Sequence, residues 1–121
     1  MACVPGADTG SSRVGRVVDP EPDEYSQDVL DLVERIPSGH VMSYGDIAEY
    51  LERGGPRQVG AVMAGWGGAV PWWRVVRADG RPPPGHEARA LPHYAAEATP
   101  LRPRSARVDM RKARWEGPQG P

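Results

Sequence analysis

The apolar residues between positions 23 and 36 recur at the spacing of an α-helix. Four of them share one face of that helix: Val29, Leu32, Val33 and Ile36. Acidic residues occupy its first turn, where they face the positive end of the helix dipole. The segment Pro37-Ser38-Gly39 ends the pattern. Residues 1–22 are rich in Gly, Ser, Asp and Pro and show no period, so we expect a disordered N-terminal tail there.

Two shorter helical stretches follow. Ser43 is a good N-cap for the first of them, and Asp46, three residues later, is suited to complete a capping box. The inward residues of this stretch are Ile47, Ala48 and Leu51. Pro56 opens the second stretch, residues 56–66, at a position where its missing N–H removes no hydrogen bond. The expected core face of this helix is formed by Val59, Val62 and Met63.

The turn between these two helices contains Gly54-Gly55, and two short helices joined by a glycine turn are typical of a helix-turn-helix. The second helix begins with Arg57, Gln58 and Gly60, at the positions that reach nucleic acid in such a motif. The pattern therefore indicates a DNA-binding motif. An ordinary helical hairpin is the alternative, because such hairpins are common in proteins that bind no DNA.

The centre of the chain is rich in glycine and proline. Gly67-Gly68 leads into a short stretch, ending at Val76, that we expect to be extended. Residues 78–80 have the composition of a turn. The prolines of residues 81–85 exclude both a helix and a central strand, so this segment is expected to be a loop.

A fourth helix is expected over residues 86–98. Its predicted buried face consists of Ala90, Leu91, Tyr94 and Ala95. Residues 101–104 and 107–110 are expected to pair as a small hairpin, and Trp115 to dock back on the body of the protein. Residues 117–121 have the composition of a frayed C-terminus.

Together these elements predict a mainly α domain over residues 23–116, with a minor β element. A chain of 121 residues can bury one modest core, which favours a single domain. No apolar run approaches the ~20 residues of a membrane span, and no secretory signal is evident at the N-terminus. We therefore expect a protein without a membrane partner.

Cysteine and histidine usage argues against metal chemistry. The single cysteine, Cys3, cannot form an internal disulfide, which fits a reducing, cytoplasmic setting. His40, His86 and His93 lie far apart in the sequence and lack the spacing of metal ligands. The sequence predicts neither a metal site nor a cofactor.

Charge is divided unequally along the chain. Residues 1–55 contain 4 basic and 11 acidic side chains, whereas residues 56–121 contain 11 basic and 5 acidic ones. Arginine, which suits phosphate and base-edge contacts better than lysine, accounts for fourteen of the 15 basic residues. This division indicates a one-sided contact with an anionic partner. Solvated surface charge is the alternative.

Two adjacent tryptophans, Trp72 and Trp73, are the main candidates for a binding site. On an extended segment they point to opposite faces, so one can pack in the core while the other lines a cavity. An indole face in a cavity is a stacking partner for a flipped base. The alternative is that both are core residues, as most tryptophans are. Indole is only a hydrogen-bond donor, and no nucleophile stands beside a base in this sequence, so such a cavity would bind without reacting.

Tyr44 and Arg57 are the other two candidates. Tyr44 lies at the start of the first helix of the pair, where a half-buried core tyrosine is the alternative interpretation. Arg57 lies at a helix start, where the dipole disfavours a cation. An arginine in that position indicates a function such as DNA contact, although surface arginines often have none.

The order and spacing of several motifs resemble the DNA-binding and active-site domain of O6-alkylguanine-DNA alkyltransferases. The motifs are Ile36-Pro37-x-Gly39, Ser43-Tyr44-Gly45, Ile47-Ala48, Pro56-Arg57-x-Val59-Gly60, Met63 and Pro71-x-x-Arg74-Val75-Val76. In that family the last motif reads Pro-Cys-His-Arg-Val, and its cysteine accepts the alkyl group. Trp72 stands at the position of the cysteine and Trp73 at that of the histidine. The chain therefore resembles the non-enzymatic, alkyltransferase-like branch of the family.

The resemblance implies a winged helix-turn-helix-like fold that enters the minor groove and flips the damaged guanine into a pocket. Arg57 matches the arginine that fills the vacated place in the stack, and Tyr44 the tyrosine that helps rotate the nucleotide outwards. The implied DNA-binding set is Ser43, Tyr44, Arg57, Gln58 and Gly60. The implied lesion pocket consists of Pro71, Trp72, Trp73, Arg74 and Val75. The implied partners are duplex DNA containing O6-alkylguanine and nucleotide excision repair proteins, contacted by a monomer.

The sequence also departs from the family in three ways. The separate N-terminal domain of the alkyltransferases is absent, and the segment between Met63 and Pro71 is short, with Trp66-Gly67-Gly68 at the usual place of an asparagine hinge. Replacing the histidine dismantles the acid–base relay, even where a glutamate, for which Glu97 is the candidate, remains.

Two other functions remain open at this point. A helix-turn-helix transcriptional regulator would read undamaged DNA as a dimer, but no dimerisation helix is visible in the sequence. A true alkyltransferase using another nucleophile ranks last, because the only thiol, Cys3, lies outside the matched segment.

Overall fold

The first helix begins and ends where the sequence pattern predicts. In the computed structural model, which describes residues 23–118, α1 spans Glu24–Arg35. The carboxylate of Asp23 caps it by accepting a hydrogen bond from the backbone N–H of Ser26 at 2.8 Å. All four predicted core residues of this stretch are buried, Ile36 just after the helix end. The expected disordered tail, residues 1–22, lies outside the described residues.

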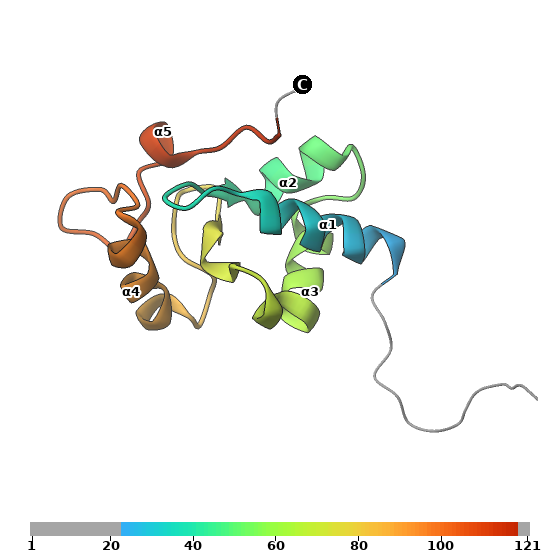
Figure 1. Ribbon diagram of the computed structural model, residues 1–121, viewed down its shortest axis with the longest axis horizontal. Coiled ribbons are helices and arrows are strands. Elements are labelled where there is room, and N and C mark those ends of the chain that lie inside the picture. The colour runs from blue at the N-terminus through green and yellow to red at the C-terminus, as the bar shows by residue number, and fades with distance from the viewer. Residues whose placement is uncertain (1–22, 119–121) are drawn as a thin grey trace, which may run out of the picture.

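The two helices of the predicted helix-turn-helix are also present (Figure 1). Helix α2 spans Tyr44–Leu51, and both hydrogen bonds of the predicted capping box between Ser43 and Asp46 are formed, each at 3.0 Å. Helix α3 spans Pro56–Trp66 and begins at the predicted proline. Its N-terminal N–H of Gly55 is satisfied by the side-chain oxygen of Gln58 at 2.9 Å.

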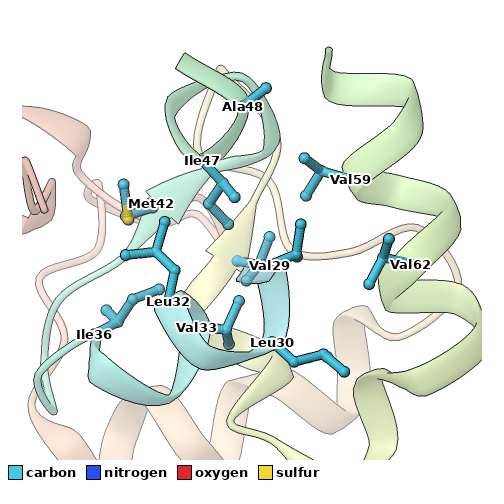
Figure 2. Close-up of a cluster of buried hydrophobic side chains, with 11 residues drawn as sticks. Val29, Leu30, Leu32, Val33, Ile36, Met42, Ile47, Ala48, Val59 and Val62 are labelled. Atoms are coloured by element: carbon cyan, nitrogen blue, oxygen red, sulfur yellow. The ribbon is translucent and has the colours of Figure 1, made fainter. Parts of the chain in front are cut away.

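A first hydrophobic core joins these three helices (Figure 2). Its buried members are Val29, Leu30, Leu32, Val33, Ile36, Met42, Ile47, Ala48, Val59, Val62 and Val75. Met63, expected in this core, is only partly buried and packs at its edge. Trp115 also packs against it, which confirms that the C-terminal segment docks back on the body.

A two-stranded parallel sheet separates this core from a second one. Strand β1 (Met42–Ser43) pairs with β2 (Val75–Val76), with Met42 opposite Val75 and Ser43 opposite Val76. Because successive residues of a strand point to opposite faces, Met42 and Val75 enter the first core while Val41 and Val76 enter the second. The second core consists of Val41, Val76, Ala90, Tyr94, Val108 and Ala113. A mainly α fold with a minor β element is thus confirmed.

Three predicted elements differ from the structure. The stretch expected to be extended contains two 3₁₀ turns, η1 (Gly67–Ala69) and η2 (Trp72–Arg74), and only its last two residues form a strand. Helix α4 spans Glu87–Glu97, close to the prediction, but the expected inward residues Leu91 and Ala95 are exposed. The single turn of helix that touches the core buries Ala90 and Tyr94 alone, so the apolar face is narrower than predicted.

The predicted C-terminal hairpin is reduced to one bridge, between Leu101 and Val108. Met110, expected in its second strand, instead begins the short helix α5 (Met110–Ala113), which the side chain of Asp109 caps. Of the segment expected to fray, Gly117 is buried and Pro118 partly buried, and residues 119–121 lie outside the described residues. Within residues 23–118 none of the helices has the length and apolar character needed to cross a membrane.

Candidate nucleic-acid interface

An open cleft of about 950 Å³ lies between the helix-turn-helix and the segment that runs from η1 to α4. From the first side it is lined by Tyr44, Gly45, Pro56, Arg57, Gly60, Met63 and Ala64. From the second side it is lined by Gly67, Gly68, Trp72, Arg77, Ala78, Pro83, Pro84, His86 and Arg89. The cleft thus brings α2 and α3 next to the tryptophan that replaces the family's nucleophile.

The cleft is electropositive. Three guanidinium groups line it, those of Arg57, Arg77 and Arg89, and no carboxylate does. None of the three has a salt-bridge partner in the described part of the chain, whereas Arg53, Arg74, Arg81 and Arg114 all have one. Positive charge in a concave surface concentrates the field there, so the cleft suits an anionic ligand.

Tyr44 is the first residue of α2 and directly follows the capping residue Ser43. Its ring is half-buried against the first core and also lines the cleft. Burial raises the pKa of the Tyr44 phenol, and the nearby cation of Arg77 only partly offsets this. The phenol is therefore neutral near pH 7 and offers an O–H donor at the wall of the cleft. Ser43 itself is buried and serves as the cap.

The predicted residues of α3 divide between the cleft and the helix end. Arg57 is exposed in the first turn and lines the cleft, as does Gly60. A Cβ atom at Gly60 would meet nothing within 4 Å, so packing inside the protein does not require glycine there. Gln58 does not line the cleft, and its side-chain oxygen is engaged with Gly55.

Trp72 forms part of the cleft wall and is held by aromatic and cationic neighbours. Its ring lies 5.6 Å from those of Trp73, His86 and His93, measured between centroids. The guanidinium carbon of Arg89 lies 5.7 Å from the Trp72 ring, and Nη2 of Arg89 contacts Nδ1 of His86. The indole therefore presents a partly exposed π-face beside a cation.

Trp73 points away from the cleft and towards α4. Its ring stacks on His93 with 3.7 Å between centroids, and its Nε1–H donates to Oε2 of Glu97 at 3.0 Å. The hydroxyl of Tyr94 donates to the backbone oxygen of Trp73 at 2.8 Å. The expectation that the two tryptophans face different surroundings is confirmed, although a 3₁₀ turn, rather than an extended backbone, separates them.

Glu97 is the centre of a largely buried polar cluster. Arg74 donates to both of its oxygens, at 3.1 and 2.6 Å, and to the backbone oxygen of Ile36 at 2.9 Å. The backbone N–H of Gly39 donates to the same carboxylate at 3.2 Å. Burial by itself raises the pKa of Glu97, but the hydrogen bonds from Arg74, Gly39 and Trp73 outweigh it and hold that pKa below its ordinary value. Arg74 is therefore a structural residue.

Only one of the five predicted pocket residues lines the cleft, and that residue is Trp72. Trp73 and Arg74 turn to Glu97, Val75 is fully buried, and Pro71 precedes the 3₁₀ turn. The sequence interpretation missed Arg77, His86 and Arg89, which complete the far wall. The excess of arginine in the second half of the chain was the only signal for them.

The lining groups can bind but are not arranged for nucleophilic chemistry. No thiol lines the cleft, the indole N–H of Trp72 is a donor only, and Trp73 cannot take up a proton from a neighbour. Across residues 23–118 there is no group of three or more His, Cys, Asp or Glu side chains that could hold a metal ion. The arrangement supports stacking of a planar group and pairing with phosphate.

Known proteins similar to this chain bind DNA. A DNA base-flipping protein of Escherichia coli strain K12 is 41% identical over 63 residues, which are 48% of this chain and 47% of that protein. A DNA base-flipping protein of Shigella flexneri matches to the same extent. The chain spans about half the length of the curated relatives it matches.

Solved structures extend the similarity over most of the described residues. S. pombe Atl1 in complex with damaged DNA containing O6-carboxymethylguanine has a TM-score of 0.67 and 28% identity, covering 79% of this chain and 98% of that chain. A second structure, S. pombe ATL in complex with DNA, has a TM-score of 0.64 and 29% identity over the same shares.

The family described as "6-O-methylguanine DNA methyltransferase, DNA binding domain" matches residues 24–99, which contain α1 to α4 and the whole cleft. Because this match covers more than half of the chain, the protein belongs to that family, in which its resemblance is to the alkyltransferase-like branch.

Proposed function

We propose that the protein recognises O6-alkylguanine in duplex DNA by flipping the damaged nucleotide into the cleft, and that it does not remove the alkyl group. The observation that carries this proposal is the position of Trp72. It occupies the place of the family's nucleophile and lines a cleft next to the helix-turn-helix. An indole face at that point can stack on a base or its substituent, which is worth about 1–3 kcal/mol.

The helix-turn-helix side of the cleft supplies what flipping needs. Extruding a nucleotide costs a few kcal/mol, because stacking and pairing are lost. Arg57 has no salt-bridge partner in residues 23–118 and stands exposed at the start of α3, so its side chain is available to fill the vacated place. The neutral phenol of Tyr44 lies on the same wall and can donate to the phosphate of the rotated nucleotide.

The far side of the cleft supports capture of the flipped nucleotide. Ligand sites in proteins commonly have volumes of 300–1,000 Å³, so a cleft of about 950 Å³ is roomy enough for a nucleotide with an added alkyl group. Arg77 and Arg89 bring positive charge to this wall without a carboxylate to neutralise it. Phosphate contacts of this kind add affinity that falls with salt.

The absence of alkyl transfer follows from the chemistry of the replaced residues. A thiolate beside a base would be needed to accept the alkyl group, and Trp72 offers neither. Trp73 keeps a hydrogen bond to Glu97 but only as a donor, so no proton relay operates there. A lesion that is bound and not repaired requires a further activity, and we propose that nucleotide excision repair proteins supply it. We also propose that the protein acts as a cytoplasmic monomer.

A binding titration tests the recognition step. Two duplexes of one sequence, one with guanine and one with O6-methylguanine, are titrated with the protein at fixed salt. We expect clearly tighter binding of the lesion duplex. Equal binding of both, together with a preferred undamaged sequence, would instead indicate a transcriptional regulator.

Intact mass measurement tests the absence of transfer. The protein is incubated with the O6-methylguanine duplex, and we expect its mass to remain unchanged while the lesion stays in the DNA. A stoichiometric gain of one methyl group that persists in Cys3→Ala would overturn the non-enzymatic proposal.

A further inference from the structure

A tight loop rich in arginine follows the family-matched segment, which ends at residue 99. We call residues 101–108 the arginine loop, because Arg102, Arg104 and Arg107 are three of its eight residues and no carboxylate is present. The backbone N–H of Arg102 donates to the oxygen of Arg107 at 2.9 Å, and Leu101 bridges to Val108. The loop is therefore closed at its base.

The tip of the arginine loop has a defined shape. Arg104 adopts a left-handed conformation with φ of 54°, which turns the chain sharply. The hydroxyl of Ser105 accepts a hydrogen bond from the backbone N–H of Arg107 at 2.9 Å. Arg102 and Arg104 are exposed, so their guanidinium groups project from a preformed turn.

The arginine loop is seated on the turn that leads out of the cleft. The backbone N–H of Val108 donates to the oxygen of Gly80 at 2.8 Å, and Val108 is fully buried. Gly80 has φ of 91°, and a Cβ atom there would lie 2.3 Å from the oxygen of Val108, so the two segments are in close contact. Arg77, at the start of the same turn, lines the cleft. The loop thus continues the basic wall of the cleft.

Positive charge dominates where the loop and the turn meet. One carboxylate, Asp79, faces the cations of Arg81, Arg107 and Arg77. Its pKa is lowered first by a hydrogen bond from the backbone of Arg81 and then by these three cations. Asp79 forms a salt bridge with Arg81 only, and in the described part of the chain Arg102, Arg104 and Arg107 have none. The excess charge is left for an anionic partner.

The arginine loop also lies far from the recognition helix. Figure 1 shows it (orange) at one end of the molecule beside α4, with the cleft-lining segment between it and α3. Anions that it contacts are therefore not those next to α3.

We propose that the arginine loop binds backbone phosphates of the same duplex, outside the segment that α3 contacts. The inference rests on the proposed function, since it assumes that the protein binds duplex DNA. Guanidinium groups pair with phosphate through two hydrogen bonds, and such contacts carry no base information. The loop therefore adds affinity without changing the preference for the lesion, and it requires DNA long enough to reach it.

The test compares the double variant Arg102→Gln/Arg104→Gln with the parent protein on two lengths of lesion and plain duplex. On about 30 base pairs, we expect a several-fold loss for both DNAs and a salt slope (log K against log salt) smaller in magnitude by up to about 1.8, at about 0.9 per phosphate. On about 10 base pairs, one helical turn, we expect the variant to bind like the parent.

A matched control separates position from net charge. Arg111→Gln/Lys112→Gln removes the same two charges from exposed positions on α5, and we expect it to bind more nearly like the parent. Unchanged binding of the long duplex by the loop variant, or equal losses in both double variants, would overturn the proposal. Failure of the parent to bind any duplex would instead remove the proposed function and this inference with it. Thermal unfolding of each variant shows that the fold is kept.

Discussion

Trp72 is the residue on which recognition of the lesion depends, because it alone of the two tryptophans lines the cleft. Its π-face is left open there, while its edges contact Trp73, His86 and His93. The neighbouring Trp73 is occupied by His93 and Glu97 and has no such face to offer. Two identical side chains next to each other in the sequence thus have separate roles.

Replacing Trp72 with alanine is therefore expected to act mainly on the lesion complex. Loss of about 1–3 kcal/mol of stacking would weaken binding of O6-alkylguanine DNA about tenfold or more, at 1.4 kcal/mol per decade. Plain duplex should bind almost as before, because the helix-turn-helix makes those contacts. Titrations with both DNAs, alongside thermal unfolding, measure this.

Trp73→Phe is the matched control for Trp72→Ala. It keeps a ring against His93 and removes the hydrogen bond to Glu97, so we expect a stability loss of about 1 kcal/mol and an unchanged preference for the lesion. If Trp72→Ala unfolds more easily but discriminates normally per folded molecule, Trp72 is a core residue and the lesion binds elsewhere.

Arg57→Ala should lower affinity for both duplexes and remove much of the difference between them. The reason is that no other side chain at the start of α3 can fill the place of a flipped base, since Pro56 is short and Gln58 caps the helix. Arg35→Ala removes an exposed arginine at the end of α1 and serves as the control. Discrimination that survives in Arg57→Ala would exclude Arg57 from the site.

At the scale of elements, local signals explain why α2 and α3 begin where predicted. A side-chain cap, a capping box and a first-turn proline act within four residues and need no tertiary partner. The turn at Trp72–Arg74 is different, because its backbone is held by Tyr94 and its side chains by Glu97, both more than twenty residues away. This is the physical reason why the prediction of an extended segment was wrong.

The cap of α2 gives a prediction at this scale. Ser43→Ala removes the acceptor for the backbone N–H of Asp46 and should lower the free energy of unfolding by about 1 kcal/mol. Ser38→Ala, in the exposed turn after α1, should have little effect. Denaturant titration compares the two, and equal stabilities would show that the capping box contributes nothing.

At the scale of the whole molecule, Glu97 joins three parts of the fold: the loop after α1, the turn of η2 and the end of α4. The two hydrophobic cores meet along the β1–β2 pair, so this cluster and the sheet together hold the helix-turn-helix against α4. The cleft is the surface between these two halves. Its width therefore depends on contacts that lie outside it.

Stability is accordingly expected to depend on the charge of Glu97. Its pKa in the folded protein lies below the ordinary value of 4.5, so its contribution is complete above about pH 4.5 and is lost as the pH falls through the lower, folded pKa. Glu97→Gln should lose about 3 kcal/mol near neutral pH, since Arg74 is left buried without its partner. It should also show a flatter decline of stability at acidic pH.

Unfolding measured from neutral pH to pH 2 compares the two proteins. Parallel pH curves for Glu97→Gln and the parent would show that other carboxylates determine the acid sensitivity. Asp109→Asn, at the cap of α5, is a suitable comparison, because that carboxylate does not contact the cluster.

The sequence by itself determined the helices, their caps, the helix-turn-helix and the presence of tryptophan where the family has its nucleophile. These features depend on residues close together in the chain, and period, capping and motif order report them directly. Only the tertiary structure decided that Met42 pairs with Val75, that Trp73 and Arg74 turn to Glu97, and which cations surround Trp72. Parallel pairing and convergence of Arg57 with Arg77 and Arg89 bring together residues twenty or more positions apart. Such contacts follow from how the two cores pack, and no local pattern in the chain encodes them.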